Sequence, residues 1–266
     1  MKQDFFHQAG KAFLRLLNIV DELREKCPWD KEQTMQSIRH LTIEEVHELS
    51  EAILQENTTE IKKELGDILL HVLFYAKIAS ETNAFNLIDV IEHLCHKLIR
   101  RHPHIYGEIK AETSNLVKQN WEQIKQNEQD KKISVLQGVP SGLPALIKAY
   151  RMQEKAASVG FDWDNALQVW QKVQEELNEL NQAVQNQNRV QIQEEFGDLL
   201  FSLVNYARFI GINPDDALEQ TNKKFKSRFE YIEQQAQIQG KNLSDMSLSE
   251  MNAYWHQAKE INKKDE

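Results

Sequence analysis

Glycine, proline and cysteine are scarce in this chain of 266 residues, which contains 9, 5 and 2 of them respectively. So few helix breakers disfavour a turn-rich β architecture and make an all-α fold the expectation. The two cysteines, Cys27 and Cys95, lie far apart without metal-site spacing, which suits a reducing compartment. No run approaches the roughly 18 apolar residues of a membrane span, and the first residues form no signal-peptide core. We therefore expect a cytoplasmic protein without a membrane association.

Basic residues are also fewer than acidic residues. The chain has 32 Lys and Arg residues against 41 Asp and Glu residues, which gives a formal net charge of −9. A surface that follows the phosphates of DNA or RNA is usually basic, so direct nucleic-acid binding is not expected. The acidity does not exclude a small phosphate-bearing ligand, provided that a metal ion mediates the contact.

The most informative feature that is present is an internal repeat. The segment Glu44-Glu45-Val46-His47-Glu48 returns as Glu175-Glu176-Leu177-Asn178-Glu179, and Glu64-Leu65-Gly66-Asp67 returns as Glu195-Phe196-Gly197-Asp198. In both copies 15 residues separate the two motifs. The match extends to a tyrosine, a basic pair and a tryptophan: Tyr75 and Tyr206, Lys97/Arg101 and Lys224/Arg228, Trp121 and Trp255. A tandem duplication explains all of these together.

Helix breakers gather between the two copies. Four of them fall within seven residues: Gly138, Pro140, Gly142 and Pro144. We therefore predict an N-terminal domain over 1–132, a linker over 133–143 and a C-terminal domain over 144–266.

Within each copy the apolar residues recur at helical spacing, which predicts four to five helices per copy packed as a bundle. Ser37 and Thr42 are candidate starts for the first Glu-rich helix, and Asn57 is expected to break it. Gly66 and Gly197, which precede the last Asp of each motif, are expected to permit a close approach of helices.

The spacing of the acidic residues points to a metal site. Residues three or four apart share one face of a helix, so Glu45 aligns with Glu48, and Glu64 with Asp67. The 15-residue gap accommodates a turn, and two antiparallel helices would then bring the four carboxylates together. The corresponding set in copy two is Glu176, Glu179, Glu195 and Asp198. Like charges that are buried together need a counter-ion, and oxygen ligands suit Mg²⁺, with Mn²⁺ as a substitute.

These motifs resemble the signature of the MazG nucleotide pyrophosphohydrolases. Five neighbouring segments resemble the tandem bacterial members of that family: Cys27-Pro-Trp-Asp-Lys-Glu-Gln-Thr34, Arg100-Arg-His-Pro-His104, Trp121-Glu-Gln-Ile-Lys125, Leu143-Pro-Ala-Leu146 and Val159-Gly-Phe-Asp-Trp163. The resemblance covers essentially the whole chain. It implies a homodimer of chains with two tandem helical bundle domains, and Mg²⁺-dependent hydrolysis of nucleoside triphosphates to monophosphate and pyrophosphate.

The resemblance also implies roles for individual residues. Carried over by position, the metal ligands would be Glu176, Glu179, Glu195 and Asp198. Glu175 would hold or deprotonate the attacking water, and Trp255 would contact the nucleotide. Phosphate charge would be neutralised by Lys172, Lys224 and Arg228. A second possible site in the N-terminal copy consists of Glu44, Glu45, Glu48, Glu64, Asp67, Lys97, Arg101 and Trp121.

The C-terminal copy is the favoured catalytic copy. Lys172 lies four residues before Glu176, on the carboxylate face, whereas the matching position in copy one is Leu41. Leucine cannot contact phosphate. Gln191 stands where some tandem relatives have a lysine, which leaves that phosphate contact in doubt.

Three alternatives remain open on the sequence. A di-iron bundle is suggested by Glu44 and His47, but that chemistry needs two such motifs and copy two has Asn178 instead. The second alternative is a non-catalytic helical module that binds a nucleotide or a protein partner. The third alternative concerns the oligomeric state: the protein would be a monomer whose two copies pack together, and not a homodimer.

Overall fold

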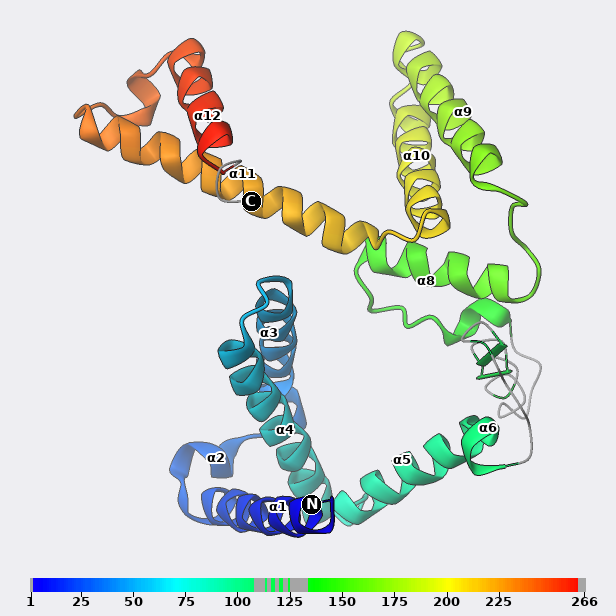
Figure 1. The fold of residues 1–266 in the computed structure, drawn as a ribbon, viewed down its shortest axis with the longest axis vertical. Coiled ribbons are helices and arrows are strands. Elements are labelled where there is room, and N and C mark those ends of the chain that lie inside the picture. The colour runs from blue at the N-terminus through cyan, green and yellow to red at the C-terminus, as the bar shows by residue number, and fades with distance from the viewer. Residues whose placement is uncertain are drawn as a thin grey trace. The chain divides into compact units, whose positions relative to one another are not determined.

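Every regular element is helical in the computed structural model, which describes residues 2–107, 113, 116, 117, 120, 121, 124 and 134–262. No strand occurs among these residues, as the predicted all-α fold requires. The chain divides into two compact units, Met1–Lys125 and Gln126–Glu266, and each contains one copy of the repeat (Figure 1). The domain limits at 132, 133–143 and 144 stay predictions, because residues 125–133 lie outside the described part.

Unit 1 is built around a helical hairpin. Its described helices are α1 (Lys2–Lys26), α2 (Pro28–Glu32), α3 (Met35–Leu54), α4 (Thr58–Glu81), α5 (Leu87–Arg101) and α6 (Pro103–Tyr106). Helices α3 and α4 form the hairpin, and its turn contains Glu56 in the left-handed region with φ 54°. Asn57 then starts α4 as expected, because its side-chain oxygen accepts the backbone N–H groups of Thr59 and Glu60.

The first acidic helix starts earlier than the sequence suggested. It begins at Met35, where Thr34 and Ser37 form a capping box. The Thr34 hydroxyl accepts the Ser37 N–H, and the Ser37 hydroxyl accepts the Thr34 N–H. Thr42 lies inside the helix, and its Oγ1 is 2.8 Å from the Tyr75 hydroxyl of α4. Ser37 and Thr42 as helix starts were therefore wrong, because Thr34 supplies the cap and both residues lie inside the helix.

An apolar core joins α1, α3 and α4 in unit 1. It consists of Val20, Ile38, Leu73 and Phe74, each 5% exposed or less. With the partly buried Phe13, Leu16 and Leu70 that pack against them, these residues recur every three or four positions along α1 and α4, so one face of each of these helices is removed from water. Phe74 of α4 belongs to this core. The matching position in copy two has a different residue, Asn205.

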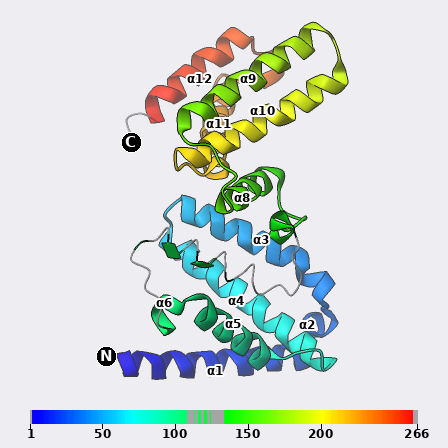
Figure 2. The ribbon, with the colours of Figure 1, turned by 90° about the vertical axis from the view of Figure 1, so that its right-hand side faces the viewer.

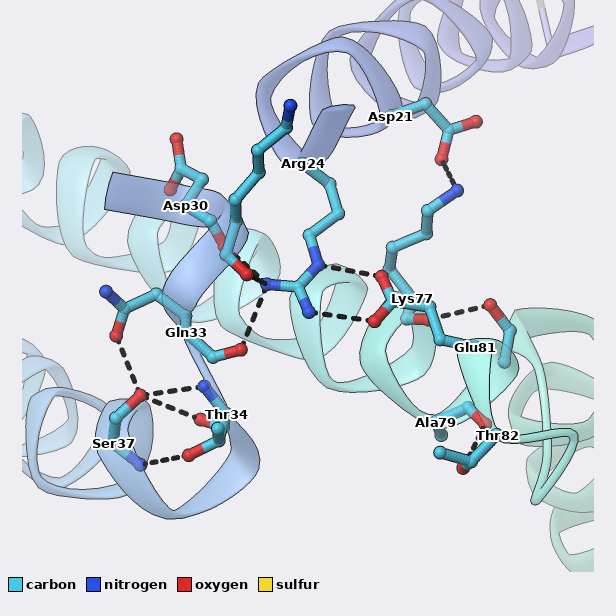
Figure 3. A network of polar contacts seen from close by, with 12 residues as sticks. Asp21, Arg24, Asp30, Gln33, Thr34, Ser37, Lys77, Ala79, Glu81 and Thr82 are labelled. Atoms are coloured by element: carbon cyan, nitrogen blue, oxygen red, sulfur yellow. Dashed lines mark hydrogen bonds and ion pairs between the residues drawn. The ribbon is translucent and has the colours of Figure 1, made fainter. Parts of the chain in front are cut away.

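A polar network fixes the ends of α1 and α4 (Figure 3). Arg24 donates to both carboxylate oxygens of Glu81, at 2.7 and 2.8 Å. It also donates to the Gln33 carbonyl at 2.9 Å, in the connection between α2 and α3. Lys77 pairs with Asp21 at 2.7 Å, which adds a second bridge between the same two helices. One guanidinium thus satisfies backbone carbonyls and a carboxylate that the connection would otherwise leave unpaired.

Unit 2 repeats the hairpin. Its described elements are η1 (Val135–Gly138), α8 (Ala145–Ser158), α9 (Ala166–Gln185), α10 (Arg189–Phe209), α11 (Pro214–Ile238), η2 (Leu243–Asp245) and α12 (Leu248–Asn262). Helices α9 and α10 lie side by side, and α8 packs against α10 (Figures 1 and 2). The hairpin turn again has a residue in the left-handed region, Gln187 with φ 54°, and Asn188 again caps the second helix.

The last two helices of unit 2 have a core of their own. Helix α12 packs along the C-terminal half of α11 (Figure 1). Ile232, Ala236 and Met246 are buried there, and Trp255 of α12 packs against them. No helix within the described residues is long and apolar enough to cross a membrane.

Candidate metal and nucleotide site

Three glutamates of unit 2 converge as the spacing predicted. Glu176 and Glu179 lie one turn apart on α9, and Glu195 lies on the facing side of α10. One carboxylate oxygen from each residue lies within 4.8 Å of the others. We call these residues the copy-two cluster. It consists of oxygen ligands only, which are the donors that hard divalent cations such as Mg²⁺ prefer.

The charge of the copy-two cluster is only partly balanced by protein groups. Lys172 donates to Glu175 at 2.6 Å and to Glu176 at 2.8 Å, and these carboxylates raise the pKa of Lys172. Burial together with the neighbouring Glu176 and Glu195 raises the pKa of Glu179. Glu176 itself is 6% exposed. A buried carboxylate beside further carboxylates is a setting that a bound cation would stabilise.

Asp198, the fourth predicted ligand, lies one turn beyond Glu195 on α10. The structure does not include it in the group of oxygens within 4.8 Å, although it lines the same cavity as Lys172 and Glu176. The expectation for Gly66 and Gly197 was wrong: a Cβ at either position would meet no atom of the described residues within 4 Å. These two glycines therefore permit no close helix contact within their own units.

Copy one forms an equivalent cluster of Glu45, Glu48 and Glu64, with oxygens within 4.8 Å, which we call the copy-one cluster. Glu64 is 2% exposed, and its buried Oε2 has no hydrogen-bond partner among the residues that the structure describes. Its other oxygen accepts from Lys63 at 2.9 Å, and this lysine lowers the pKa of Glu64. Burial, with Glu64 and Asp67 nearby, raises the pKa of Glu45 to about 6. The orphaned buried oxygen fits a metal ligand.

The two clusters obtain their lysine from different helices. In copy two it is Lys172 on α9, where copy one has Leu41. In copy one it is Lys63 on α4, where copy two has Glu194. Neither described cluster contains a histidine, and His47 lies exposed on α3. The site chemistry of the described residues is thus that of a carboxylate metal site and not that of a His-containing di-iron bundle.

Two of the predicted phosphate-binding residues, Lys224 and Arg228, lie on α11, and the predicted nucleotide contact Trp255 lies on α12. Arg228 of α11 has its guanidinium carbon 5.3 Å from the ring centroid of Trp255 on α12. Its Nε is buried and has no hydrogen-bond partner within the described ranges. Copy one repeats this pair, with Arg101 placed 5.3 Å from the Trp121 ring. Among the described residues no ion pair joins Lys224 or Arg228 to the copy-two cluster, so their phosphate-binding role stays a prediction.

A cavity beside the copy-two cluster contains residues that the sequence did not single out. Its volume is about 690 Å³, and its walls are formed by α8, α9, α10, η1 and the segment 159–163. Gln153, Asn205 and Arg208 line it together with Lys172 and Glu176. These residues come together because α8 packs against α10. The spacing of residues within one helix does not predict such a contact. Apart from the predicted metal-binding and phosphate-binding residues, the only part of the cavity that the sequence had indicated was the segment that ends at Trp163.

Comparisons with known proteins agree with this arrangement. The family model of the MazG nucleotide pyrophosphohydrolase domain matches twice, at residues 33–106 and 165–232. The chain is 43% identical over 255 residues to the nucleoside triphosphate pyrophosphohydrolase/pyrophosphatase MazG of Thermotoga maritima, covering 95% of this chain and 97% of that protein.

Two further relatives show the same extent of similarity along this chain. The nucleoside triphosphate pyrophosphohydrolase of Escherichia coli K12 is 41% identical over 254 residues, covering 92% of this chain and 96% of that protein. The uncharacterized protein YabN of Bacillus subtilis is 45% identical over 259 residues, covering 95% of this chain and 52% of that protein. With two matched domains and relatives aligned along nearly its whole length, the chain belongs to the MazG nucleotide pyrophosphohydrolase family.

Proposed function

We propose that this enzyme hydrolyses nucleoside triphosphates to monophosphate and pyrophosphate in a Mg²⁺-dependent reaction at the copy-two cluster. The observation that supports this most is the convergence of Glu176, Glu179 and Glu195 within 4.8 Å beside a lysine. The names of the Thermotoga maritima and Escherichia coli relatives support the substrate class. The donor set, all carboxylate oxygen, supports Mg²⁺, with Mn²⁺ as a substitute.

In this proposal Glu176, Glu179, Glu195 and Asp198 hold the metal. When bound, Mg²⁺ would supply charge neutralisation for the phosphates and acidify water. Asp198 belongs to the set because it faces the same cavity, one turn along α10 from Glu195. The buried position of Glu176 keeps competing water away from the carboxylates, which strengthens electrostatic contacts with a bound substrate.

The remaining residues act on water and phosphate. Glu175 is exposed on α9, one turn before Glu179, and would orient or deprotonate the attacking water. Lys172, which contacts Glu175 and Glu176, brings a positive charge to the edge of the cluster. It would neutralise phosphate charge there, a task shared with Lys224 and Arg228. Phosphoryl transfer needs such neutralisation and an aligned water more than a covalent nucleophile.

We further propose that the enzyme works in the cytoplasm as a homodimer and does not bind nucleic acid directly. The net charge of −9 supports the last point. Exposed apolar residues on both hairpins, such as Leu69 of α4 and Leu200 of α10, support pairing of chains. Sedimentation at the mass of one chain would contradict the dimer.

The proposal is tested by pyrophosphate release from a panel of triphosphates. The variants are Glu176→Gln and Asp198→Asn, with the matched copy-one variants Glu45→Gln and Asp67→Asn as controls. We expect release that stops in EDTA and in both copy-two variants but continues in the copy-one pair. The reverse pattern would move the reaction to copy one. Mg²⁺-dependent binding without turnover of any triphosphate would instead indicate a non-catalytic nucleotide-binding module.

A further inference from the structure

The cavity beside the copy-two cluster has a polar end and an apolar body. Lys172, Glu176 and Asp198 line one part of its wall, and apolar side chains from α8, α9, α10, η1 and the segment 159–163 line most of the rest. Three aromatic residues, Phe161, Trp163 and Phe201, also border it, and each is more than 40% exposed. A volume of about 690 Å³ lies in the range of small-molecule sites. The cavity thus suits a ligand with a charged end and a flat apolar body.

Gln153 places an unpartnered acceptor in this wall. It is 7% exposed, and its Nε2 donates to the Phe201 carbonyl at 2.8 Å. This bond fixes the orientation of the amide, because a flip would set two acceptor oxygens against each other. Its Oε1 is buried, and no group in the described part of the chain forms a hydrogen bond with it. A buried acceptor in this state is stabilised by any ligand that presents an N–H or O–H group to it.

Asn205 supplies an oriented donor to the same wall. Its Oδ1 accepts from Nε of Arg208 at 3.0 Å and from Nη2 at 2.9 Å. Arg208 is itself fixed by Asp162, to which its Nη1 donates at 3.0 Å. The guanidinium has no acceptor atom, so it selects the oxygen of the Asn205 amide and leaves Nδ2 available for donation. Asn205 and Gln153 therefore present complementary groups, one donor and one acceptor.

Copy one has no amide at the position of Asn205. Counted from the repeated motifs, Phe74 occupies the position of Asn205, and His71 that of Ser202. Phe74 is 5% exposed and packs with Val20 and Leu73 in the core of unit 1. The hairpin therefore does not need an amide at this position for its own packing. The polar pair of copy two calls for an explanation outside folding.

We propose that the cavity binds the base of the nucleotide, and that Gln153 and Asn205 determine which bases are accepted. This rests on the proposed function, since the triphosphate is what the copy-two cluster would hold. Every nucleobase is planar and carries a hydrogen-bond donor beside an acceptor on its edge. The Oε1 of Gln153 accepts from that edge, and the Nδ2 of Asn205 donates to it. Phe161 and Trp163 at the rim offer aromatic surface to the ring.

The test compares substitutions that keep side-chain size but remove the polar groups. The variants are Gln153→Met and Asn205→Leu, with Gln193→Met on the exposed face of α10 as a control. For ATP, GTP, CTP and UTP we would measure kcat and KM of pyrophosphate release, and the Kd of the non-hydrolysable α,β-methylene analogues. We expect KM and Kd of the best base to rise roughly tenfold with kcat little changed. The ratio between the best and worst base should shrink.

A third variant covers the case in which either substitution prevents folding. Asn205→Asp preserves the shape and the contact with Arg208 while it replaces the donor with an acceptor, so the order of the four bases should change. Unchanged base ratios in all three variants, in an active wild type, would overturn the inference and leave the proposed function intact. Base-dependent binding that the variants abolish, without turnover by the wild type, would support the inference and reject the proposed function. No nucleotide binding by the wild type would reject both.

Discussion

The pairing of Lys172 with Glu176 leads to a prediction that joins stability to metal binding. The ammonium is 2.8 Å from the carboxylate, and the two side chains are 34% and 8% exposed. Breaking a fully buried pair costs about 3–5 kcal/mol, whereas an exposed pair contributes about 0–1 kcal/mol. Because a third of the lysine is in water, we expect Lys172→Met to lower the free energy of unfolding by about 1–2 kcal/mol in metal-free buffer.

The assay is urea unfolding of the full chain, followed by circular dichroism, in EDTA and in excess Mg²⁺. A cation bound to the cluster would replace the lost positive charge, and the variant would bind it without repulsion from Lys172. The deficit should therefore be smaller in Mg²⁺ than in EDTA. Lys226→Met is the control, since its 3.9 Å pair with Glu230 is exposed on both sides, and its effect should stay within about 0.5 kcal/mol.

Two results would refute this reasoning. A Lys172→Met variant as stable as the wild type in EDTA would show that the ion pair does not compensate the buried carboxylate. An equal deficit in EDTA and in Mg²⁺ would show that no cation takes over that compensation, and would count against Glu176 as a metal ligand.

Two further predictions concern unit 1. The pKa of Glu45 is raised from 4.5 to about 6, so the folded state holds this proton more tightly than the unfolded state. In metal-free buffer the resulting stability is fully present below pH 4.5 and is lost as the pH rises through about 6; urea titrations across this window should show the decline in the wild type and not in Glu45→Gln. Tyr75→Phe removes the 2.8 Å contact with Thr42 and should cost about 1 kcal/mol. In the same unfolding assay Tyr206→Phe should cost less, since no residue in the described part of the chain forms a hydrogen bond with its hydroxyl; equal costs would contradict the assignment.

The parts of the fold and site that follow from local sequence could be predicted. Helical content, the paired hairpins and the convergence of Glu176, Glu179 and Glu195 all depend on spacing within one or two adjacent helices. The start of α3 was missed because Thr34 and Ser37 are both suitable N-cap residues. Their side chains alone do not show at which of the two the helix begins. Such choices between neighbouring hydroxyls are decided by the backbone and not by composition.

Other features depend on contacts between helices that are distant in the sequence. The orphaned oxygen of Gln153 arises because α8 packs its amide against the Phe201 carbonyl of α10. No sequence motif near Gln153 indicates this contact. The fixed orientation of Asn205 likewise requires Arg208 to be held by Asp162, which lies 46 residues away in the chain. Periodicity indicates which face of a helix is buried, but not which polar group will meet which partner across the interface.

The different origin of the lysine in the two clusters has a consequence for the history of the duplication. A chimera that joined the first hairpin helix of copy one to the second of copy two would have Leu41 and Glu194 at these positions, and so no lysine to compensate its glutamates. The reciprocal chimera would have both Lys172 and Lys63 around one cluster. The halves of the two hairpins have therefore ceased to be interchangeable. Recombination between the repeats would produce chains with the right backbone and the wrong charge.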